Sequence, residues 1–241
     1  MFQEDLVFDL GMHSGEDTEY YLKKGFRVVG VDANPRLVDS VRERFRSEIA
    51  DRRLSVENIG IHNTEQVLTF YLNHDVDEWS SFEKRLGTRD NTRFSTLDVP
   101  CRRLDYLIGK YGMPYYLKID VEGLDASIMR DLARWTIRPA YASLEDDGID
   151  CLVALYETGA RQFKFINQVA IRDYAPPEVA LEGRSVQHSF GVGSSGPFGR
   201  ELPGEWLEPS SAFNFYTQSV RPPGQGPIDG WWDIHALYGK Y

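Results

Sequence analysis

The sequence predicts an α/β fold in which helices cover both faces of a mostly parallel sheet. Over residues 1–170, short runs of β-type residues alternate with amphipathic stretches, which is the pattern of repeated strand–helix units. Glycines follow the first expected strand, and an acidic residue ends the second. Both features are typical of ligand sites at the carboxyl ends of strands in such sheets.

The expected strands lie at residues 6–10, 27–32, 54–61, 115–120, 139–145 and 163–168, with a further extended run at 67–73. The expected helices lie at 15–24, 34–50, 101–112, 124–132 and 151–159. Gly25 ends the first helix, because glycine readily adopts the left-handed conformation at a helix C-terminus. Pro35 begins the second helix, where its missing N–H costs no hydrogen bond. The 101–112 helix carries apolar or aromatic residues in helical register at Leu104, Leu107, Ile108 and Tyr111. Residues 73–97 read as a polar loop.

The C-terminal segment differs in composition, because eight of the twelve prolines lie from Pro176 onward and glycine-rich runs recur. A flexible tail is one interpretation, but the segment carries more aromatic residues than disordered chains usually do. We therefore expect residues 171–241 to form a loop-rich extension that completes the sheet and covers the mouth of its ligand site. It would form one globular unit with the 1–170 domain. Within it, residues 212–218 (AFNFYTQ) are expected to be a strand.

Composition excludes several classes of protein. The 241 residues include 37 Asp or Glu against 27 Lys or Arg, giving a formal net charge of −10. Proteins that bind nucleic acid by neutralising phosphates need basic surfaces instead. No apolar run approaches the ~18 residues of a membrane span, and two cysteines without a CxxC pair indicate neither a disulfide framework nor a zinc site. We expect a cytoplasmic protein without nucleic-acid or membrane partners.

The turn after the first strand is the most informative stretch of the chain. Gly11 and Gly15 let the chain turn tightly and let a ligand approach the backbone. Asp32 ends the neighbouring strand about 20 positions later, where a carboxylate can accept both hydrogens of a ribose diol. The pattern predicts a nucleoside-containing cofactor. For the loop taken alone, an ordinary strand–helix turn with solvated carboxylates is the alternative.

Two cofactors fit this geometry, and their charges distinguish them. A dinucleotide needs a GxGxxG turn whose middle glycine lets the backbone approach the pyrophosphate, but His13 occupies that place. Glu16 and Asp17 at the start of the next helix would also repel a pyrophosphate. S-adenosylmethionine has no phosphate and carries a cationic sulfonium, so nearby acids favour it. We predict S-adenosylmethionine and keep an NAD-dependent oxidoreductase or epimerase as the alternative.

Several motifs accompany this loop along the chain. They are Asp9, Gly11, Gly15 and Thr18; Asp32-Ala33-Asn34-Pro35; residues 58–63 (NIGIHN); Ser80-Ser81; Lys118-Ile119-Asp120-Val121-Glu122-Gly123; and Glu145. Together they resemble the FkbM-type family of S-adenosylmethionine-dependent methyltransferases, over a stretch from about Leu6 to Gln168. The six-residue motif at 118–123 is the most specific of them. His13 departs from the family, which commonly has asparagine there.

The resemblance implies a Rossmann-like sheet of seven strands, the last antiparallel and supplied by residues 212–218. It also implies methyl transfer to a hydroxyl of a sugar, glycan or secondary metabolite. The cofactor-binding residues it indicates are Asp9, Gly11, Met12, His13, Ser14, Gly15, Thr18, Asp32, Ala33, Asn58 and Ser81. A protein that kept this fold but only binds S-adenosylmethionine or a carbohydrate is a further alternative.

A hydroxyl acceptor must lose a proton during methyl transfer, which requires a base within hydrogen-bond reach. Asp120 and Glu122 lie at the carboxyl end of the 115–120 strand, where their alternation lets both face one cleft. We expect Asp120 to border the sulfonium or methionine end of the cofactor, and Glu122 to orient or deprotonate the acceptor. The alternative is that Asp120 caps the following helix.

Three residues are expected to contact the acceptor: Trp79, Glu145 and His188. Trp79 could stack on a sugar face, Glu145 belongs to an acidic strand end, and His188 is an alternative base in the extension. The carboxylates at 145–147, with Asp150, could hold Mg²⁺. Oxygen ligands at this spacing are equally typical of a solvated turn, so we predict no metal.

Overall fold

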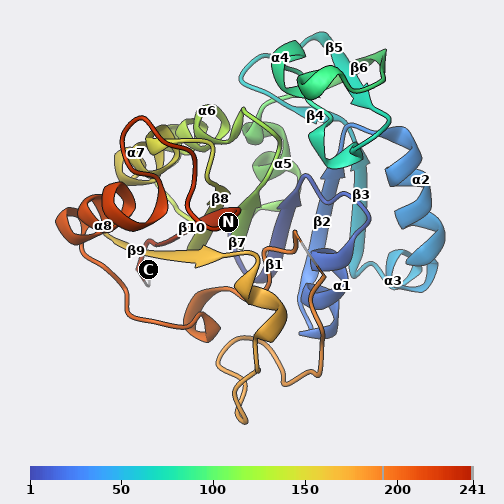
Figure 1. Ribbon diagram of the computed structural model, residues 1–241. Coiled ribbons are helices and arrows are strands. Elements are labelled where there is room, and N and C mark those ends of the chain that lie inside the picture. Colours follow the sequence, from blue (N-terminus) through green and yellow to red (C-terminus); the bar gives the residue numbers. More distant parts are fainter. Residues whose placement is uncertain (192, 240–241) are drawn as a thin grey trace.

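The computed structural model describes residues 1–191 and 193–239, and contains a large and a small sheet (Figure 1). The strands of the large sheet are β1 (Phe2–Leu10), β2 (Arg27–Asp32), β3 (Leu54–Asn58), β7 (Met113–Ile119), β8 (Tyr141–Glu145), β9 (Gln162–Asn167) and β10 (Trp232–Leu237). Those of the small sheet are β4 (Gly60–Ile61), β5 (Val67–Asn73) and β6 (Phe94–Arg102).

The large sheet has the strand order β3-β2-β1-β7-β8-β10-β9. β1 pairs in parallel with both β2 and β7, whereas β10 runs antiparallel to β8 and β9. The order therefore reverses between β1 and β7, which is where open α/β sheets bind ligands. This Rossmann-like α/β sheet, with its last strand antiparallel, confirms the predicted fold class.

Helices pack on both faces of the large sheet. They are α1 (Glu16–Lys23), α2 (Pro35–Arg44), α3 (Arg46–Ala50), α5 (Leu104–Tyr111), α6 (Asp125–Arg130), α7 (Ile149–Glu157) and α8 (Pro209–Phe215), with a π-helical turn at Tyr216–Val220. The short helix α4 (Lys84–Gly87) packs on β5 of the small sheet instead. Short 3₁₀ segments lie at Asp77–Trp79, Arg89–Asn91, Asp131–Arg134, Ala170–Asp173 and Gly199–Glu201. None of these helices of the described chain is both long and apolar enough to cross a bilayer.

The pleat of β1 divides the interior into two cores. Leu6, Phe8 and Leu10 belong to a core that also contains buried residues of α5, α6 and α7. Val7 points to the opposite face and packs in a second core with residues of α1 and α2. Alternate side chains of a strand leave on opposite faces, so one buried strand supplies both cores.

The strand expected at 212–218 was predicted wrongly, because this segment is helical. Pro209 occupies the first turn of α8, where a proline is favoured, and the helix passes into the π-helical turn. The last strand of the sheet is β10 instead. Residues 73–97 also differ from the expected polar loop, since they include α4 and the beginning of β6.

Residues 60–102 form a small unit that we call the cap. In Figure 1 it stands at the upper corner of the molecule, beside the carboxyl ends of the central strands. Its sheet has the order β4-β6-β5, and Phe70, Leu72 and Val99 make its own buried cluster. The cap therefore has an independent core and can present side chains to the large sheet.

The C-terminal extension packs against the second core. Phe198 is buried and its ring stacks on that of Tyr116, with 4.2 Å between centroids. Glu201 forms an ion pair with Lys24 at the C-terminal end of α1, at 2.7 Å between Oε1 and Nζ. These contacts hold the first part of the extension on the same face of the sheet as α1, whereas α8 and the π-helical turn contribute Ala212, Tyr216 and Val220 to the first core.

Candidate active site

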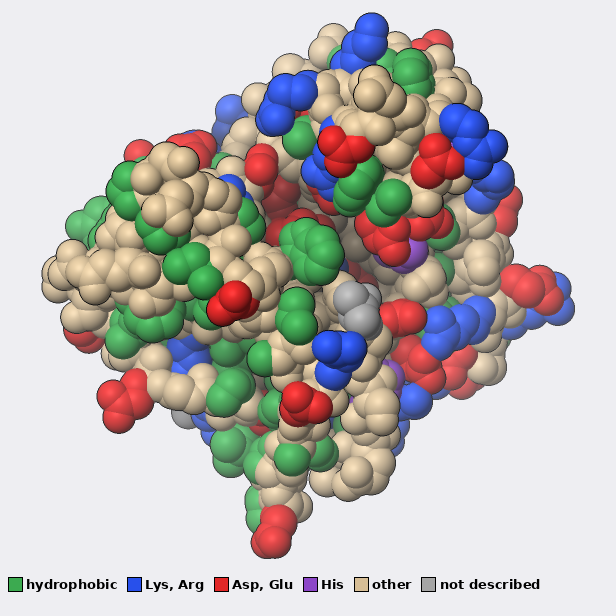
Figure 2. All heavy atoms as spheres, viewed as in Figure 1, with side chains coloured by type: hydrophobic (Ala, Val, Ile, Leu, Met, Phe, Trp, Pro, Cys, Tyr) green, Lys and Arg blue, Asp and Glu red, His purple; other side chains and the backbone are tan. Residues whose placement is uncertain are grey.

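A cavity of about 430 Å³ opens at the carboxyl ends of β1, β2, β7 and β8. Figure 2 shows a hollow near the middle of this face, with acidic side chains gathered around it below the cap. Its walls come from the β1–α1 turn, the end of β2, the cap, the turn after β7, the end of β8, and the extension. The site is thus assembled from segments that span most of the chain.

The β1–α1 turn lies directly against the turn after β7. Gly11 has a φ of 80°, and a Cβ added there would stand 1.7 Å from the carbonyl oxygen of Asp120. The amide of Asp120 in turn donates a hydrogen bond to the carbonyl of Leu10, at 2.9 Å. Only glycine fits at position 11, both because of the space and because of the left-handed backbone.

Asp32 is held in a fixed orientation at the end of β2. Its Oδ2 accepts a hydrogen bond from the amide of His13 at 3.0 Å, and its Oδ1 accepts one from the amide of Asn34 at 2.7 Å. Asn58 donates to the backbone carbonyl of Asp32 at 3.0 Å, which steadies the strand end. Burial raises the pKa of Asp32 to about 6, against the effect of these amides. Because Asp32 lines the cavity, its fixed carboxylate offers two oriented hydrogen-bond acceptors to a ligand there.

Lys118, at the end of β7, forms ion pairs with three carboxylates at the cavity wall and just behind it. Its Nζ lies 3.3 Å from Asp9, 3.3 Å from Asp120 and 3.7 Å from Asp17. Burial alone would lower the pKa of Lys118, but the surrounding carboxylates hold it well above its ordinary value. Thr18 donates to the other oxygen of Asp9 at 2.6 Å. Lys118 therefore stays charged and fixes Asp120 at the cavity wall.

Glu122 lies two residues further and faces the same cavity. Burial raises its pKa to about 7, Arg89 lowers it, and Asp120 raises it. A carboxyl group whose pKa lies near neutrality can both accept and return a proton, as a general base must.

Glu145 at the end of β8 completes the acidic wall. Burial, with the charges of Asp120 and Glu122, raises its pKa well above the usual range.

Two tryptophans from different parts of the chain line the cavity. Trp79 comes from the cap, and Trp231 comes from the extension just before β10. Trp231 is 51% exposed, which places it at the mouth of the cavity rather than in a core. Gly193 and Ser194 add a second wall segment from the extension.

The structure brings together most of the predicted site residues. Those that line the cavity are Gly11, Met12, His13, Ser14, Asp32, Ala33, Trp79, Asp120, Glu122 and Glu145. Asp9, Gly15, Thr18, Asn58 and Ser81 do not line it but lie behind the wall, where several support a lining residue. His188 lies elsewhere: its ring packs against Tyr20 and Phe190. His188 does not line the cavity, so the contact with the acceptor that we expected for it is not found.

The carboxylates considered for Mg²⁺ do not converge. Asp146 accepts hydrogen bonds from Tyr216 and Arg221, and Asp150 is paired with Arg130. Elsewhere among the described residues, His13, Asp77 and Glu78 could offer ligand atoms within 4.8 Å of one another. Exposed groups of this kind are common without a metal, and Asp77 already lies 3.2 Å from Nε2 of His13.

Sequence reasoning missed several residues of the site. Lys118 was considered only as the ion-pair partner of an acidic neighbour, which the structure shows it to be, and not as a residue that lines the site. Ser194 and Trp231 belong to the proline- and glycine-rich extension, and Gln168 follows β9. The glycine-rich run around Ser194 was the available signal, since such loops commonly approach ligands closely.

Comparison with known proteins identifies the family to which the chain belongs. Residues 9–167 match the model of the methyltransferase FkbM domain. The chain belongs to the FkbM methyltransferase family. This confirms the resemblance carried by the motifs, and the membership supports a function in methyl transfer. No curated protein matches the chain in sequence.

Solved structures give weaker similarities to this chain. A methyltransferase FkbM from Methylobacillus flagellatus KT is 14% identical, with a TM-score of 0.47; the match covers 69% of this chain and 41% of that one. The chain thus spans about two fifths of that relative's length. A precorrin-6y C5,15-methyltransferase from Geobacter metallireducens GS-15 is 10% identical with a TM-score of 0.43, covering 99% and 82% of the two chains.

Proposed function

We propose that this FkbM methyltransferase transfers the methyl group of S-adenosylmethionine to a hydroxyl of a sugar, glycan or secondary metabolite. One observation carries the proposal. A single cavity combines Asp32, oriented by two backbone amides, with Asp120 and Glu122 at the adjoining strand end. The first group suits the ribose of a nucleoside cofactor, and the second suits a reaction in which a proton must leave.

The residues present fit S-adenosylmethionine. Asp32 would accept hydrogen bonds from the ribose hydroxyls, and the backbone at Gly11 leaves room for close approach. Val31, Leu37 and Ile59 line the cavity around β2 and β3 and would surround an adenine ring. The acids of the β1–α1 turn suit a cationic ligand and oppose a pyrophosphate. A volume of about 430 Å³ lies in the range of small-molecule sites.

In this proposal Glu122 acts as the base. When bound, S-adenosylmethionine supplies a methyl group on a positively charged sulfur, which leaves as a neutral thioether. The acceptor oxygen forms the new bond to the methyl carbon, and its proton passes to the Glu122 carboxylate. Lys118 holds Asp120 at the wall, so the negative charge facing the sulfonium stays in place. Much of the rate then comes from holding the acceptor in line with the methyl group.

The cavity wall also favours a particular kind of acceptor. Trp79 and Trp231 offer flat apolar surfaces, while Glu122 and Glu145 offer hydrogen-bond acceptors. A sugar presents an apolar ring face together with hydroxyl groups, so it matches both. We include the extension in the acceptor site, because Ser194 and Trp231 both reach the cavity.

Two measurements test this function. Thermal unfolding with S-adenosylmethionine, its demethylated product S-adenosylhomocysteine, or NAD identifies the cofactor, because a ligand that binds the folded state stabilises it. We expect the first two to raise the melting temperature. A shift with NAD alone would instead favour the oxidoreductase alternative.

Transfer of radiolabelled methyl groups to a panel of sugars, glycans and hydroxylated metabolites then tests the reaction. We expect Glu122→Gln to remove turnover while S-adenosylmethionine still binds. Glu65→Gln, an exposed change on the cap, is the matched control and should leave turnover unchanged. Full turnover by the Glu122 variant would rule out this base.

A further inference from the structure

The turn that carries Glu122 is held by the cap at three places. Ser81 Oγ donates a hydrogen bond to the backbone carbonyl of Glu122, at 2.8 Å. Gly123 packs so closely on Leu86 that an added Cβ would lie 2.4 Å from its Cδ1. The third contact joins the side chains of Arg89 and Glu122, with 3.4 Å between Nη2 and Oε1. All three cap residues lie on one short segment of the chain.

The backbone of this turn is strained, so contacts from the cap are needed to hold its conformation. Glu122 has a φ of 55°, in the left-handed region that residues with a side chain seldom adopt. Strain of this kind persists only where the surroundings hold it, and it is concentrated at functional sites. The conformation of the turn decides where the Glu122 carboxylate stands in the cavity. The cap therefore helps to place that carboxylate.

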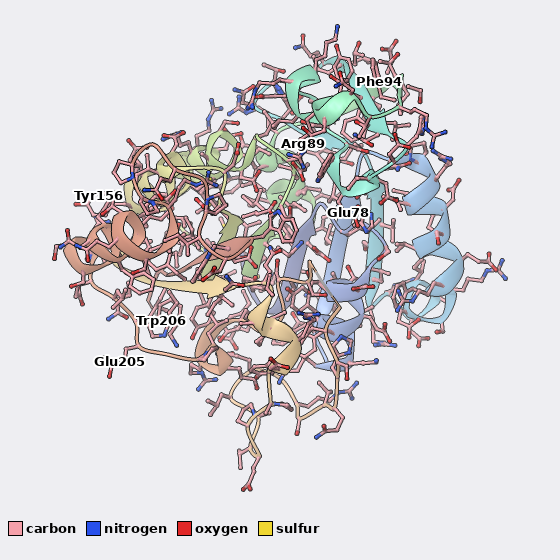
Figure 3. All side chains as sticks on the ribbon, in the orientation of Figure 1. Glu78, Arg89, Phe94, Tyr156, Glu205 and Trp206 are labelled. Atoms are coloured by element: carbon pink, nitrogen blue, oxygen red, sulfur yellow. The ribbon has the colours of Figure 1, made fainter. Side chains whose placement is uncertain are left out.

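Arg89 is itself held in place by Trp79. Its guanidinium lies over the indole ring, 4.3 Å from the centroid, and Trp79 lines the cavity. A guanidinium that stacks by its face keeps its N–H groups in the ring plane for a carboxylate. Figure 3 places Arg89 on the side of the cap next to the large sheet, whereas Phe94 lies at its far end. The arginine is thus a fixed cation at the boundary between the two units.

Arg89 also opposes the effect that the neighbouring carboxylates have on the pKa of Glu122. Asp120 from the same turn and Asp147 from the segment after β8 raise the pKa of Glu122, in addition to burial. Glu145 and Asp125 also interact unfavourably with its charge. Arg89 acts against all of these, both by its charge and by its hydrogen bond. Without it, more of the Glu122 side chain would be protonated at neutral pH and unable to accept a proton.

We propose that Arg89 is a positioning residue, through which the cap aims the Glu122 carboxylate at the acceptor and keeps it ionised. Trp79 supports Arg89 in this role and forms part of the acceptor wall at the same time. The inference rests on the proposed function, because it takes Glu122 as the base. Arg89 acts on the reaction through Glu122 and through no contact of its own with the reacting atoms.

The ionisation of Glu122 can be measured without an acceptor. Protein labelled with ¹³C at the glutamate carboxyl carbon is titrated by NMR in the absence of ligand, and Glu122→Gln assigns the signal. We expect Arg89→Gln to lower the ratio of ionised to protonated Glu122 at pH 7 by about tenfold. Arg89→Lys, which keeps the charge, should restore most of it. Arg85→Gln, which removes an exposed charge from the same segment, is the matched control and should change nothing.

An unchanged Glu122 titration in Arg89→Gln would overturn the proposal. Should that variant fail to fold, Trp79→Leu carries the test, since it removes the surface that holds the guanidinium and should shift the titration in the same direction. With an acceptor from the panel above, the acidic limb of the kcat profile should move to higher pH in Arg89→Gln. Full activity of Glu122→Gln would refute the proposed base, whereas an inactive Glu122→Gln with an unshifted Arg89→Gln titration would refute the role of Arg89 alone.

Discussion

The carboxylate of Asp17, in the first turn of α1, accepts a hydrogen bond from the backbone amide of Ser195 at 3.0 Å. Its second oxygen accepts one from the amide of Gly196 at 3.2 Å. The hydroxyl of Ser194 donates to Glu16 at 3.3 Å. Because Ser194 lines the cavity, the start of α1 fixes a wall segment that comes from the distant C-terminal extension.

Replacing Asp17 by Ala should therefore loosen this wall. Two buried amides would lose their acceptor, at a cost of about 1–3 kcal/mol for each unpaired group. We expect weaker binding of S-adenosylhomocysteine in calorimetry and faster proteolysis within the extension. Glu19→Ala, on the more exposed side of α1, is the control and should leave both unchanged. Unaltered affinity and protease resistance in Asp17→Ala would show that the extension is held by other contacts.

Asp32→Asn should weaken cofactor binding more than it weakens the fold. The amide cannot accept two ribose hydroxyls with the strength of a carboxylate, and hydrogen bonds to charged groups contribute about 1.5–3 kcal/mol each. We expect the Kd for S-adenosylmethionine to rise by roughly 10- to 100-fold in calorimetry. Asp39→Asn, at an exposed position of α2, should bind normally. If Asp32→Asn binds as the unaltered protein does, Asp32 does not contact the ribose.

The parts of the site that were predictable are contiguous in sequence. The turn from Gly11 to Gly15 and the turn at Asp120 and Glu122 each follow a strand directly, so the α/β pattern alone brings them to one sheet edge. The contact between Arg89 and Glu122 was not predictable in this way. It depends on how the cap folds, and no local pattern near Arg89 indicates its partner.

The last strand was misplaced for a related reason. Residues 212–218 are rich in the aromatic residues that favour strands, yet Pro209 starts a helix there. In β10, Asp233 and His235 alternate with apolar residues but are about 1% exposed, so the positions that a half-buried strand would turn to solvent are buried as well. His235 stacks near Tyr116 on the second-core side of the sheet. Buried polar residues of this kind are specified by tertiary packing, which single-sequence periodicity does not report.

The buried pair of Lys24 and Glu201 should be important for stability. Their side chains are 2% and 1% exposed, and Glu201 also accepts hydrogen bonds from Tyr20 and from the amides of Leu181 and Glu182. Removing one partner of a buried pair leaves an uncompensated charge, which costs about 3–5 kcal/mol.

We therefore expect Glu201→Ala to lower the free energy of unfolding in urea by that amount. Glu201→Gln, which keeps an acceptor for the amides, should lose less. The control is Asp5→Ala, which breaks the exposed pair with Arg27 and should cost about 1 kcal/mol or less. Equal effects of Glu201→Ala and Asp5→Ala would contradict a structural role for the buried pair.

The pH dependence of stability follows from the buried carboxyl groups, which include Glu145 and five others. Burial raises the pKa of Asp17 and Asp32 to about 6, of Glu122 and Asp233 to about 7, and of Asp125 to about 8. Each group binds its proton more tightly in the folded chain than in the unfolded chain, where the pKa is about 4. Their contribution to stability is present in full below about pH 4 and is lost as the pH rises through the folded values. His235 acts in the opposite sense, because burial lowers its pKa to about 3; its contribution is lost as the pH falls below about 6.5.

Between pH 8 and pH 6 the carboxyl groups therefore dominate. We expect the free energy of unfolding of the cofactor-free protein, measured in urea, to be greater at pH 6 than at pH 8 by about 2–5 kcal/mol. Asp125→Asn removes the group with the highest of these pKa values and should reduce the difference by about 1–2 kcal/mol. Glu65→Gln, at an exposed position, should leave the difference unchanged. Greater stability at pH 8 would mean that nearby cations or hydrogen-bond donors stabilise the ionised carboxylates of the folded protein, so that their pKa values are not raised.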